Sequence, residues 1–199
     1  MVGLKFIWHT PFPGRIFIAM EMVFNTSYGL KINPNETVRE ILSFIKDKPN
    51  AHYKVIIGSD SLHLQDNGAD FVTAIVVHRV GNGGRYFWRR LDLGKFYNLH
   101  DRIIQEVMLS IDTAKTLLAD LEKATKEHEA MGIKLNWDFE IHVDVGENGP
   151  TKNLIQEVVG MVRANNFEAK TKPDSYAASK VADRYVWCNL INFNIKPFF

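Results

Sequence analysis

The sequence predicts an α/β domain, in which a mixed β-sheet is flanked by helices and preceded by an N-terminal extension. Three observations predict this fold class. β-branched runs between residues 53 and 93 are typical of strands, a long amphipathic stretch follows from about residue 100, and strand and helix patterns then alternate to the end of the chain. We therefore expect residues 1–36 to form an arm or extension packed on the core, and residues 37–199 to form one domain.

The first element expected after the extension is a short helix. Thr37 and Glu40 have the spacing of a capping box, in which two side chains satisfy free backbone N–H groups at a helix start. An apolar stripe at helical spacing follows before Pro49, made of Val38, Ile41, Leu42 and Ile45. Residues 1–36 are rich in aromatic residues and Met, and Pro and Gly interrupt this segment. This composition fits short strands or an arm.

Three sequential antiparallel strands are expected next. The first begins at Tyr53 and runs through apolar residues into the polar tip Gly58–Ser61. The second covers Phe71–Val80, and Gly81–Gly84 supplies the positive φ angles of a tight hairpin into a third strand over Arg85–Leu93.

The second half of the chain alternates helices and strands. The spacing predicts a long helix from about His100 to Met131, which Gly132 stops. The remaining expected elements are a strand over Trp137–Val145, a helix after the turn Gly146–Lys152, a strand over Phe167–Lys172, and a last helix capped by Asp174 or Ser175 that runs through about Val186.

Composition excludes several classes of protein. Cys188 is the single cysteine, so internal disulfides and Cys-rich zinc sites within one chain are excluded. No run of about 18 apolar residues occurs, so we expect neither a membrane span nor a secretory signal, and a cytoplasmic location. With 24 Lys and Arg against 23 Asp and Glu, the net charge of +1 gives no global reason to expect nucleic acid.

Four acidic residues occupy positions that suggest chemistry. Asp60 and Asp144 end two predicted strands, and Glu106 and Asp183 lie on predicted helices. If the two strands are parallel neighbours, both aspartates emerge at the carboxyl edge of the sheet, where α/β proteins bind ligands. Oxygen ligands without cysteine suit Mg²⁺ or Mn²⁺, and two such ions about 4 Å apart can assist phosphodiester hydrolysis. The pattern therefore indicates a metal-dependent nuclease.

Four segments carry a resemblance to a known family. The element order and the segments Ile57–Ser61, Phe71–Arg79, His142–Gly146 and Ser175–Arg184 resemble the ribonuclease H-like superfamily and, within it, the bacterial YkuK-type family of predicted nucleases. The resemblance runs from about residue 24 to 186. It implies a five-stranded mixed sheet in spatial order 3-2-1-4-5, with the first three strands antiparallel, and a ribonuclease H-like domain over residues 37–199.

The resemblance also implies roles for the acids. Asp60 would bridge both ions, Asp144 would be the second strand ligand, and Glu106 and Asp183 would be helix ligands. The alternatives are structural: an Asx turn or cap at Asp60, an exposed strand face at Asp144, and a pair with Arg102 for Glu106. Asp174 is the rival of Asp183.

Basic residues near the acids are candidates for binding a nucleic-acid backbone, namely Lys152, Lys170, Lys172, Lys180 and Arg184. His63, just past Asp60, is a candidate for proton transfer. The loop Gly146–Lys152 lacks the spacing of a phosphate-binding motif, but Lys152 and the following helix start could attract phosphate. A second set of basic residues lies on the predicted hairpin and is either a nucleic-acid surface or the solvent-exposed face of that hairpin. This set comprises Arg79, Arg85, Arg89 and Arg90.

Two functions follow from these observations. The first is a Mg²⁺- or Mn²⁺-dependent nuclease that acts on RNA, DNA or a hybrid. The alternative is a non-catalytic nucleic-acid-binding or adaptor module that keeps the fold. Aromatic residues near the termini further suggest an exposed apolar surface and a homodimer. They are Trp8, Phe193, Phe198 and Phe199.

Overall fold

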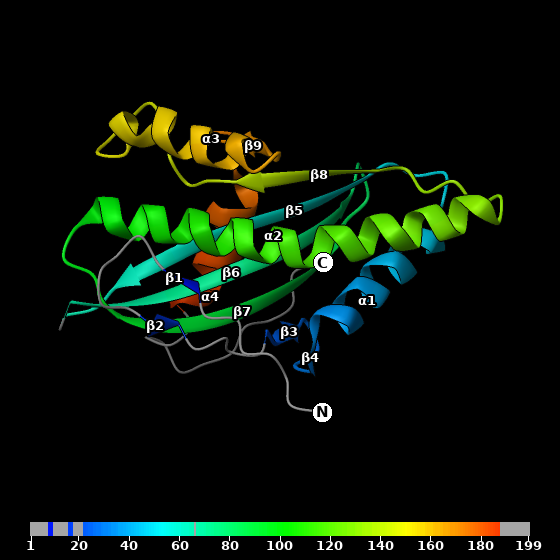
Figure 1. Ribbon diagram of the computed structural model, residues 1–199, viewed down its shortest axis with the longest axis horizontal. Coiled ribbons are helices and arrows are strands. Elements are labelled where there is room, and N and C mark those ends of the chain that lie inside the picture. Colours follow the sequence, from blue (N-terminus) through cyan, green and yellow to red (C-terminus); the bar gives the residue numbers. More distant parts are fainter. Residues whose placement is uncertain (1–7, 10–15, 18–21, 66, 188–199) are drawn as a thin grey trace.

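The computed structural model describes residues 8–9, 16–17, 22–65 and 67–187 (Figure 1). Two short strands, β1 (Trp8–His9) and β2 (Ile16–Phe17), pair with each other and form a separate small sheet. The predictions that concern Cys188 and the three C-terminal phenylalanines fall outside the described residues. All other elements belong to one layered α/β structure around a seven-stranded sheet.

The main sheet has the spatial order β4-β3-β7-β6-β5-β8-β9. Its strands are β3 (Phe24–Thr26), β4 (Lys31–Ile32), β5 (Tyr53–His63), β6 (Gly68–Arg79), β7 (Gly84–Lys95), β8 (Trp137–His142) and β9 (Glu168–Lys170). β5, β6 and β7 pair antiparallel, whereas β8 is parallel to β5 and β9 is parallel to β8. The mixed α/β class is therefore confirmed.

The predicted five-stranded sheet is found, with its first three strands antiparallel, but it is part of a larger sheet of seven strands. The five predicted strands follow one another as β7-β6-β5-β8-β9, but β3 and β4 extend the sheet beyond β7. β3 pairs antiparallel with β7 through Asn25↔Trp88 and Thr26↔Phe87. Both added strands come from the segment expected to be an arm, and at two or three residues they are too short to show a periodic pattern in the sequence.

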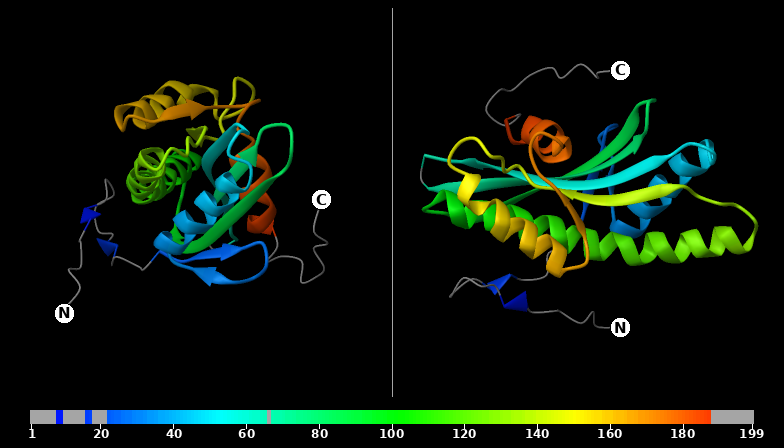
Figure 2. Two further views of the ribbon diagram at one scale, coloured as in Figure 1. Left: turned by 90° about the vertical axis from the view of Figure 1, so that its right-hand side faces the viewer. Right: turned by 90° about the horizontal axis from the view of Figure 1, so that it is seen from above.

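Helices cover both faces of the sheet. They are α1 (Pro34–Asp47), α2 (Leu99–Ala130), the 3₁₀ turn η1 (Lys152–Leu154), α3 (Ile155–Ala164), the π-helical segment η2 (Ala177–Ala182) and α4 (Asp183–Trp187). α1, α2 and α3 lie on one face, and η2 with α4 lies alone on the other (Figures 1 and 2). The predicted last helix thus begins as a π-helix, a form that is often found at functional sites.

α1 begins earlier than the sequence predicted. Asn33 is its N-cap, and the side chains of Asn33 and Glu36 complete a capping box with hydrogen bonds of 3.0 and 2.9 Å. Thr37, the expected cap, is instead buried in the second turn and donates its hydroxyl to the carbonyl of Asn33. Pro34 at the first helical position is the sequence signal that favours the earlier start.

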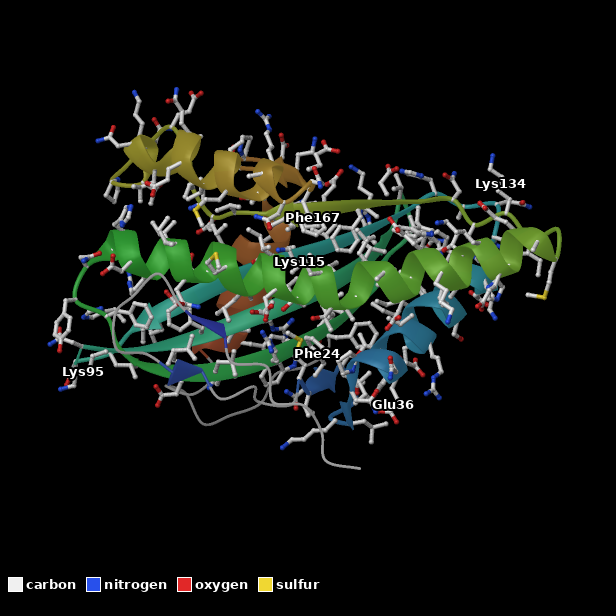
Figure 3. All side chains as sticks on the ribbon, viewed as in Figure 1. Phe24, Glu36, Lys95, Lys115, Lys134 and Phe167 are labelled. Atoms are coloured by element: carbon white, nitrogen blue, oxygen red, sulfur yellow. The ribbon has the colours of Figure 1, made fainter. Side chains whose placement is uncertain are left out.

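The core lies between the sheet and its larger helical layer. Alternate residues of β5, Tyr53, Val55 and Ile57, point into the same apolar cluster as the buried faces of α1, α2 and α3. Phe24 and Phe167, from distant parts of the chain, belong to this cluster too (Figure 3). On the other face, smaller clusters join β5 and β6 to η2. Among the described residues, no helix is long and apolar enough to cross a membrane.

Candidate carboxylate site

The four acids singled out in the sequence come from four different elements. Asp60 lies near the end of β5, and Glu106 lies in the second turn of α2. Asp144 follows the end of β8 by two residues, and Asp183 is the first residue of α4. Parallel pairing of β5 with β8 brings the ends of these two strands to the same edge of the sheet, as expected for ligand sites of α/β proteins.

An open stretch of β5 creates the space for these side chains. β8 pairs with β5 only as far as Gly58↔His142, although β5 continues to His63. Strand alternation puts Asp60 on the same face as Ile56, which packs on Ala177 of η2. Asp60 therefore faces the terminal helical segment. Ser61 points to the opposite face, where its hydroxyl donates to Oε1 of Glu106 at 2.6 Å.

Asp60 lies at the centre of the electrostatic coupling. Burial raises the pKa of its carboxyl to about 7, against a partial offset from the Ser61 N–H, which donates to Asp60 Oδ1 at 2.9 Å. The charges of Asp183 and Asp144 raise the same pKa further, and the Asp183 carboxyl is in hydrogen-bonding contact with Asp60. Two carboxyl groups in contact require either a shared proton or a cation between them.

Glu106 is the most deeply buried of the four acids, with 7% of its surface exposed. Burial raises its pKa to about 8, and the charge of Asp60 adds to this effect. The hydroxyl of Ser61 and the charge of Arg102 act in the opposite direction, and Asp144 again raises the pKa. Glu106 therefore interacts with both strand aspartates, although it comes from the helix on the other face of the sheet.

Asp144 has a cation beside it. The Nζ atom of Lys172 lies 3.1 Å from Oδ1 of Asp144. This oxygen is buried, yet it accepts no hydrogen bond among the described residues. The ion pair and the missing hydrogen bond are consistent with each other. The Lys172 ammonium is close enough to Asp144 for an ion pair, but its angle to Oδ1 is unsuitable for a hydrogen bond. The result is a buried carboxylate oxygen with unused capacity to accept or coordinate.

The four carboxylates do not form a closed set of metal ligands in this structure. Among the described residues, no three His, Cys, Asp or Glu side chains are gathered in a way that could hold one ion. Instead, Glu106 is turned to Ser61, and Asp144 is turned to Lys172. Like-charge repulsion accounts for this arrangement, because each acid takes the nearest donor or cation when nothing else neutralises the group.

Of the predicted basic residues, Lys172 forms an ion pair with one of the four acids, because its Nζ lies 3.1 Å from Oδ1 of Asp144. Lys170 pairs at 2.6 Å with Glu168, on its own strand. Lys152 and Lys180 are exposed, and Arg184 is half-buried on α4. His63 is exposed at the end of β5, where strand alternation puts it on the face opposite to Asp60.

The arginines of the β6–β7 hairpin are engaged within the protein. Arg79 donates to Asp47 at 3.2 Å, Arg85 pairs with Glu40 at 3.1 Å, and Arg90 lies 3.4 Å from Asp70. Arg89 is only 6% exposed. Each of these arginines is either paired with an acidic residue of the protein or buried. The interpretation as a nucleic-acid surface is therefore not supported.

Sequence reasoning missed a buried polar group on β8, next to the acids. Strand alternation predicts that Glu140 and His142 share one solvated face of the predicted strand with Asp138 and Asp144, but Glu140 and His142 are 5% and 1% exposed. The His142 ring accepts the N–H of Ala177 at Nδ1 and donates from Nε2 to Glu140, whose other oxygen binds Lys54 at 2.7 Å. No local pattern in the sequence distinguishes this buried face from a solvated one.

This buried group holds the terminal helical segment on the sheet. Burial lowers the pKa of His142, so the ring stays neutral with Nδ1 free to accept the Ala177 N–H. The ring also meets that of Tyr176 edge-on, with centroids 4.9 Å apart. Because Asp183 follows η2 directly, these contacts fix the position from which Asp183 reaches Asp60.

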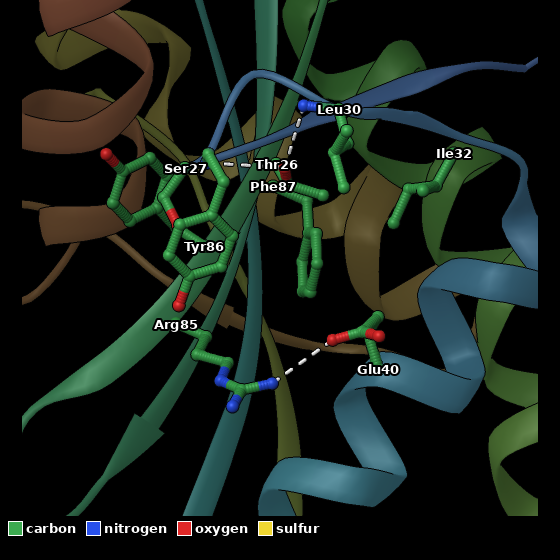
Figure 4. A pocket seen from close by; sticks show the side chains of 9 residues that line it. Thr26, Ser27, Leu30, Ile32, Glu40, Arg85, Tyr86 and Phe87 are labelled. Atoms are coloured by element: carbon green, nitrogen blue, oxygen red, sulfur yellow. Dashed lines mark hydrogen bonds and ion pairs between the residues drawn. The ribbon is translucent and has the colours of Figure 1, made fainter.

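A small pocket lies elsewhere on the molecule. It has a volume of about 200 Å³ and is enclosed by the β3–β4 hairpin, α1 and β7 (Figure 4). Leu30, Ile32 and Phe87 line it, and the Arg85–Glu40 ion pair closes one side. None of the four acids lines this pocket. The candidate site, the carboxylate cluster at the sheet edge, is therefore separate from this pocket.

Comparisons with known proteins identify the family of this chain. The family described as Ribonuclease H-like matches residues 36–186, which include all four acids. "Uncharacterized protein YkuK" of Bacillus subtilis (strain 168) is 32% identical over 155 residues, which are 75% of this chain and 88% of that protein. No solved structure matches the chain. On this evidence, the chain belongs to the ribonuclease H-like family, and within it to the YkuK type.

Proposed function

We propose that this protein is a divalent-metal-dependent nuclease that hydrolyses phosphodiester bonds of RNA, DNA or a hybrid. The observation that carries the proposal is the electrostatic coupling of four acids from four elements. Asp60 and Glu106 have pKa values raised to about 7 and about 8 by burial and by neighbouring carboxylates. Such clustered negative charge is unfavourable without a positive partner, and nuclease sites use divalent ions in that role.

The chemistry of the donors fits Mg²⁺ or Mn²⁺. All four groups are carboxylates, and hard oxygen ligands suit these ions. The buried Oδ1 of Asp144, which accepts no hydrogen bond among the described residues, is an oxygen available for coordination. When bound, divalent ions would supply the positive charge that activates a water and stabilises the departing oxygen of a phosphodiester.

Each acid has a distinct part in the proposal. Asp60, coupled to the other three, would be the shared central ligand, and Asp144 would be the second ligand from a strand. Glu106 and Asp183 would complete the set from opposite faces of the sheet. A move of Glu106 away from Ser61 and of Asp144 away from Lys172 would free the oxygens that these two acids now share with protein donors.

One observation favours a second candidate function. The described acids do not form a ready group for one ion, which is what a binding or adaptor module that no longer turns over would also present. The two candidates differ in outcome: a nuclease cuts at least one nucleic acid, whereas an adaptor binds without cutting.

The test is a cleavage assay on labelled single-stranded and duplex RNA and DNA and on a hybrid. We expect cleavage with Mg²⁺ or Mn²⁺ and none with excess EDTA. Asp60→Asn combined with Asp144→Asn should lower the rate by at least about 10³-fold, since both central ligands are weakened. Asp138→Asn is the matched control, because Asp138 is an exposed acid of β8 that pairs with His52.

Two results would count against the nuclease. Undiminished cleavage by the double variant would show that these acids are not the site. Binding of nucleic acid with no cleavage across the whole panel, in either metal, would favour the adaptor.

A further inference from the structure

We propose that Lys172 is a tethered counter-ion of the carboxylate site. In the metal-free protein its ammonium neutralises Asp144, and on metal binding it is displaced toward a phosphate oxygen of the nucleic-acid backbone. This inference rests on the proposed function and assigns a specific role to one residue of this chain.

The backbone at Lys172 is fixed beside Asp144. Val143 donates its N–H to the carbonyl of Lys170, and Lys172 donates its N–H to the carbonyl of Val145, both at 2.9 Å. These two bonds continue the β8–β9 pairing past the ends of the strands. Lys172 is therefore held opposite the segment that carries Asp144, whatever its side chain does.

The first part of the Lys172 side chain is also confined. A Cβ added at Gly146 would lie 3.0 Å from Cβ of Lys172 and 3.4 Å from its Cδ. Any larger residue at Gly146 would thus press on the lysine stem. The glycine lets the stem lie flat against the strand end, directed at Asp144.

The end of the side chain is exposed to solvent, in contrast to its stem. Lys172 is 51% exposed, and its Nζ makes an ion pair with Asp144 that lacks hydrogen-bond alignment. An exposed, poorly aligned pair of this kind contributes little to stability. It can therefore be replaced by a divalent cation, which interacts with the same carboxylate more strongly.

Other cations of this region differ from Lys172. Lys54 is held by the buried Glu140 at 2.7 Å, and Lys170 is held by Glu168. The positive charge of Arg102 lowers the pKa of Glu106 without a direct ion pair between the two side chains. Lys172 combines a hydrogen-bonded backbone, an exposed side chain and direct contact with a proposed ligand.

Displacement has a defined direction. A divalent ion held by Asp144 would repel the ammonium toward solvent, because the Lys172 side chain is 51% exposed. An ammonium held at the rim of a metal site is suited to a phosphate oxygen, as a point charge that needs no particular orientation. No covalent step is involved in this exchange of partners.

The experiment compares full-length wild type with Lys172→Gln and Lys172→Arg, and uses Lys134→Gln, at an exposed lysine that is not a site candidate, as the matched control. Isothermal titration calorimetry with MnCl₂, in the absence of nucleic acid, measures metal affinity independently of cleavage. Lys172→Gln should bind Mn²⁺ about five- to tenfold more tightly, because a competing cation is removed. Lys172→Arg and Lys134→Gln should stay within about twofold of wild type.

A second measurement tests where the ammonium goes. Fluorescence anisotropy at saturating Mn²⁺, with a phosphorothioate-linked DNA oligonucleotide that resists cleavage, should show about three- to tenfold weaker binding by Lys172→Gln. Lys172→Arg should bind about as well as wild type, because it keeps the positive charge.

The outcomes separate this inference from the proposed function. Mn²⁺ binding by wild type with unchanged affinity in Lys172→Gln would overturn the counter-ion role alone. Tighter Mn²⁺ binding with unchanged oligonucleotide affinity would overturn the displacement to phosphate. A wild type that binds no Mn²⁺ would overturn both this inference and the metal dependence of the proposed nuclease.

Discussion

Single residues of the carboxylate site make the metal-free fold sensitive to pH. Asp60 and Glu106 have ordinary pKa values of 3.8 and 4.5, and in the folded protein these rise to about 7 and about 8. The folded state then holds more protons than the unfolded state across this interval. The stability that the protonated groups contribute is complete below about pH 4 and is lost as the pH rises through 7 and 8.

This sign gives the first prediction. The free energy of unfolding of the metal-free protein should fall between pH 5 and pH 8.5, and Asp60→Asn should flatten that fall. At pH 8 the variant should be more stable than wild type by about 2–4 kcal/mol, because it removes a charge that burial disfavours. Urea unfolding at a series of pH values measures both quantities.

Metal and a control variant complete that test. Mn²⁺ at pH 8 should stabilise the wild type, since a ligand that binds the folded state adds to its stability, and should stabilise Asp60→Asn much less. Asp138→Asn, at an exposed site, should follow the wild-type pH curve. A wild-type stability that rises from pH 5 to pH 8.5 would contradict the assignment of raised pKa values.

The second prediction concerns the buried pair beside the site. Lys54→Met leaves the carboxylate of Glu140, which is 5% exposed, without its cation, and should cost about 2–4 kcal/mol in the free energy of unfolding. Lys170→Met, which breaks an exposed pair with Glu168, should cost at most about 1 kcal/mol. Equal losses in the two variants would show that Glu140 is not dependent on Lys54.

At the scale of elements, the start of α1 is set by a cap that can be tested directly. Asn33→Ala removes the side chain that accepts from the Glu36 N–H, and should cost about 1 kcal/mol in the free energy of unfolding. Asn35→Ala, in the exposed first turn of the same helix, should cost less than half as much. Thermal unfolding of both variants compares them, and a larger loss at Asn35 would contradict the cap.

The cap also illustrates how far the sequence could predict elements. Asn33–Glu36 and Thr37–Glu40 have the same spacing, and both precede apolar positions, so the pattern alone left the start ambiguous by one turn. Long elements such as β5 and α2 were predictable because their periodicity extends over many residues. β3 and β4 could not be predicted, since their pairing with β7 is a tertiary contact.

The site was predictable in part for the same reasons. Asp60 and Asp144 could be expected together because strand ends at one sheet edge meet. The burial of Glu140 and His142 could not be read from strand alternation, which separates two faces but does not say which helix covers each. The partner of Lys172 depends on the chain paths after β8 and β9, which no local pattern encodes.

At the scale of the whole molecule, topology gathers charge from distant parts of the chain. The sheet gives Asp60 and Asp144 one edge, α2 brings Glu106 from one face, and η2 and α4 bring Asp183 from the other (Figure 2). The burial of a large apolar core offsets the unfavourable free energy of this repulsion. Stability is thus given up at the place where a divalent ion would restore it.

The predicted homodimer also belongs to this scale. Met131 and Ile133, at the far end of α2, are 66% and 40% exposed, which adds apolar surface at that end of the molecule. We expect light scattering at tens of micromolar protein to give about twice the mass of one chain. The mass of a single chain at that concentration would rule out the dimer.

The central claim is that the four acids bind divalent cations together, and anomalous diffraction from a crystal soaked in MnCl₂ tests it most directly. We predict at least one anomalous peak between Asp60 and Asp144, within about 2.0–2.6 Å of a carboxylate oxygen of each, with Glu106 or Asp183 turned toward it. A well-diffracting crystal soaked at millimolar Mn²⁺ that shows no peak among these carboxylates would contradict the account.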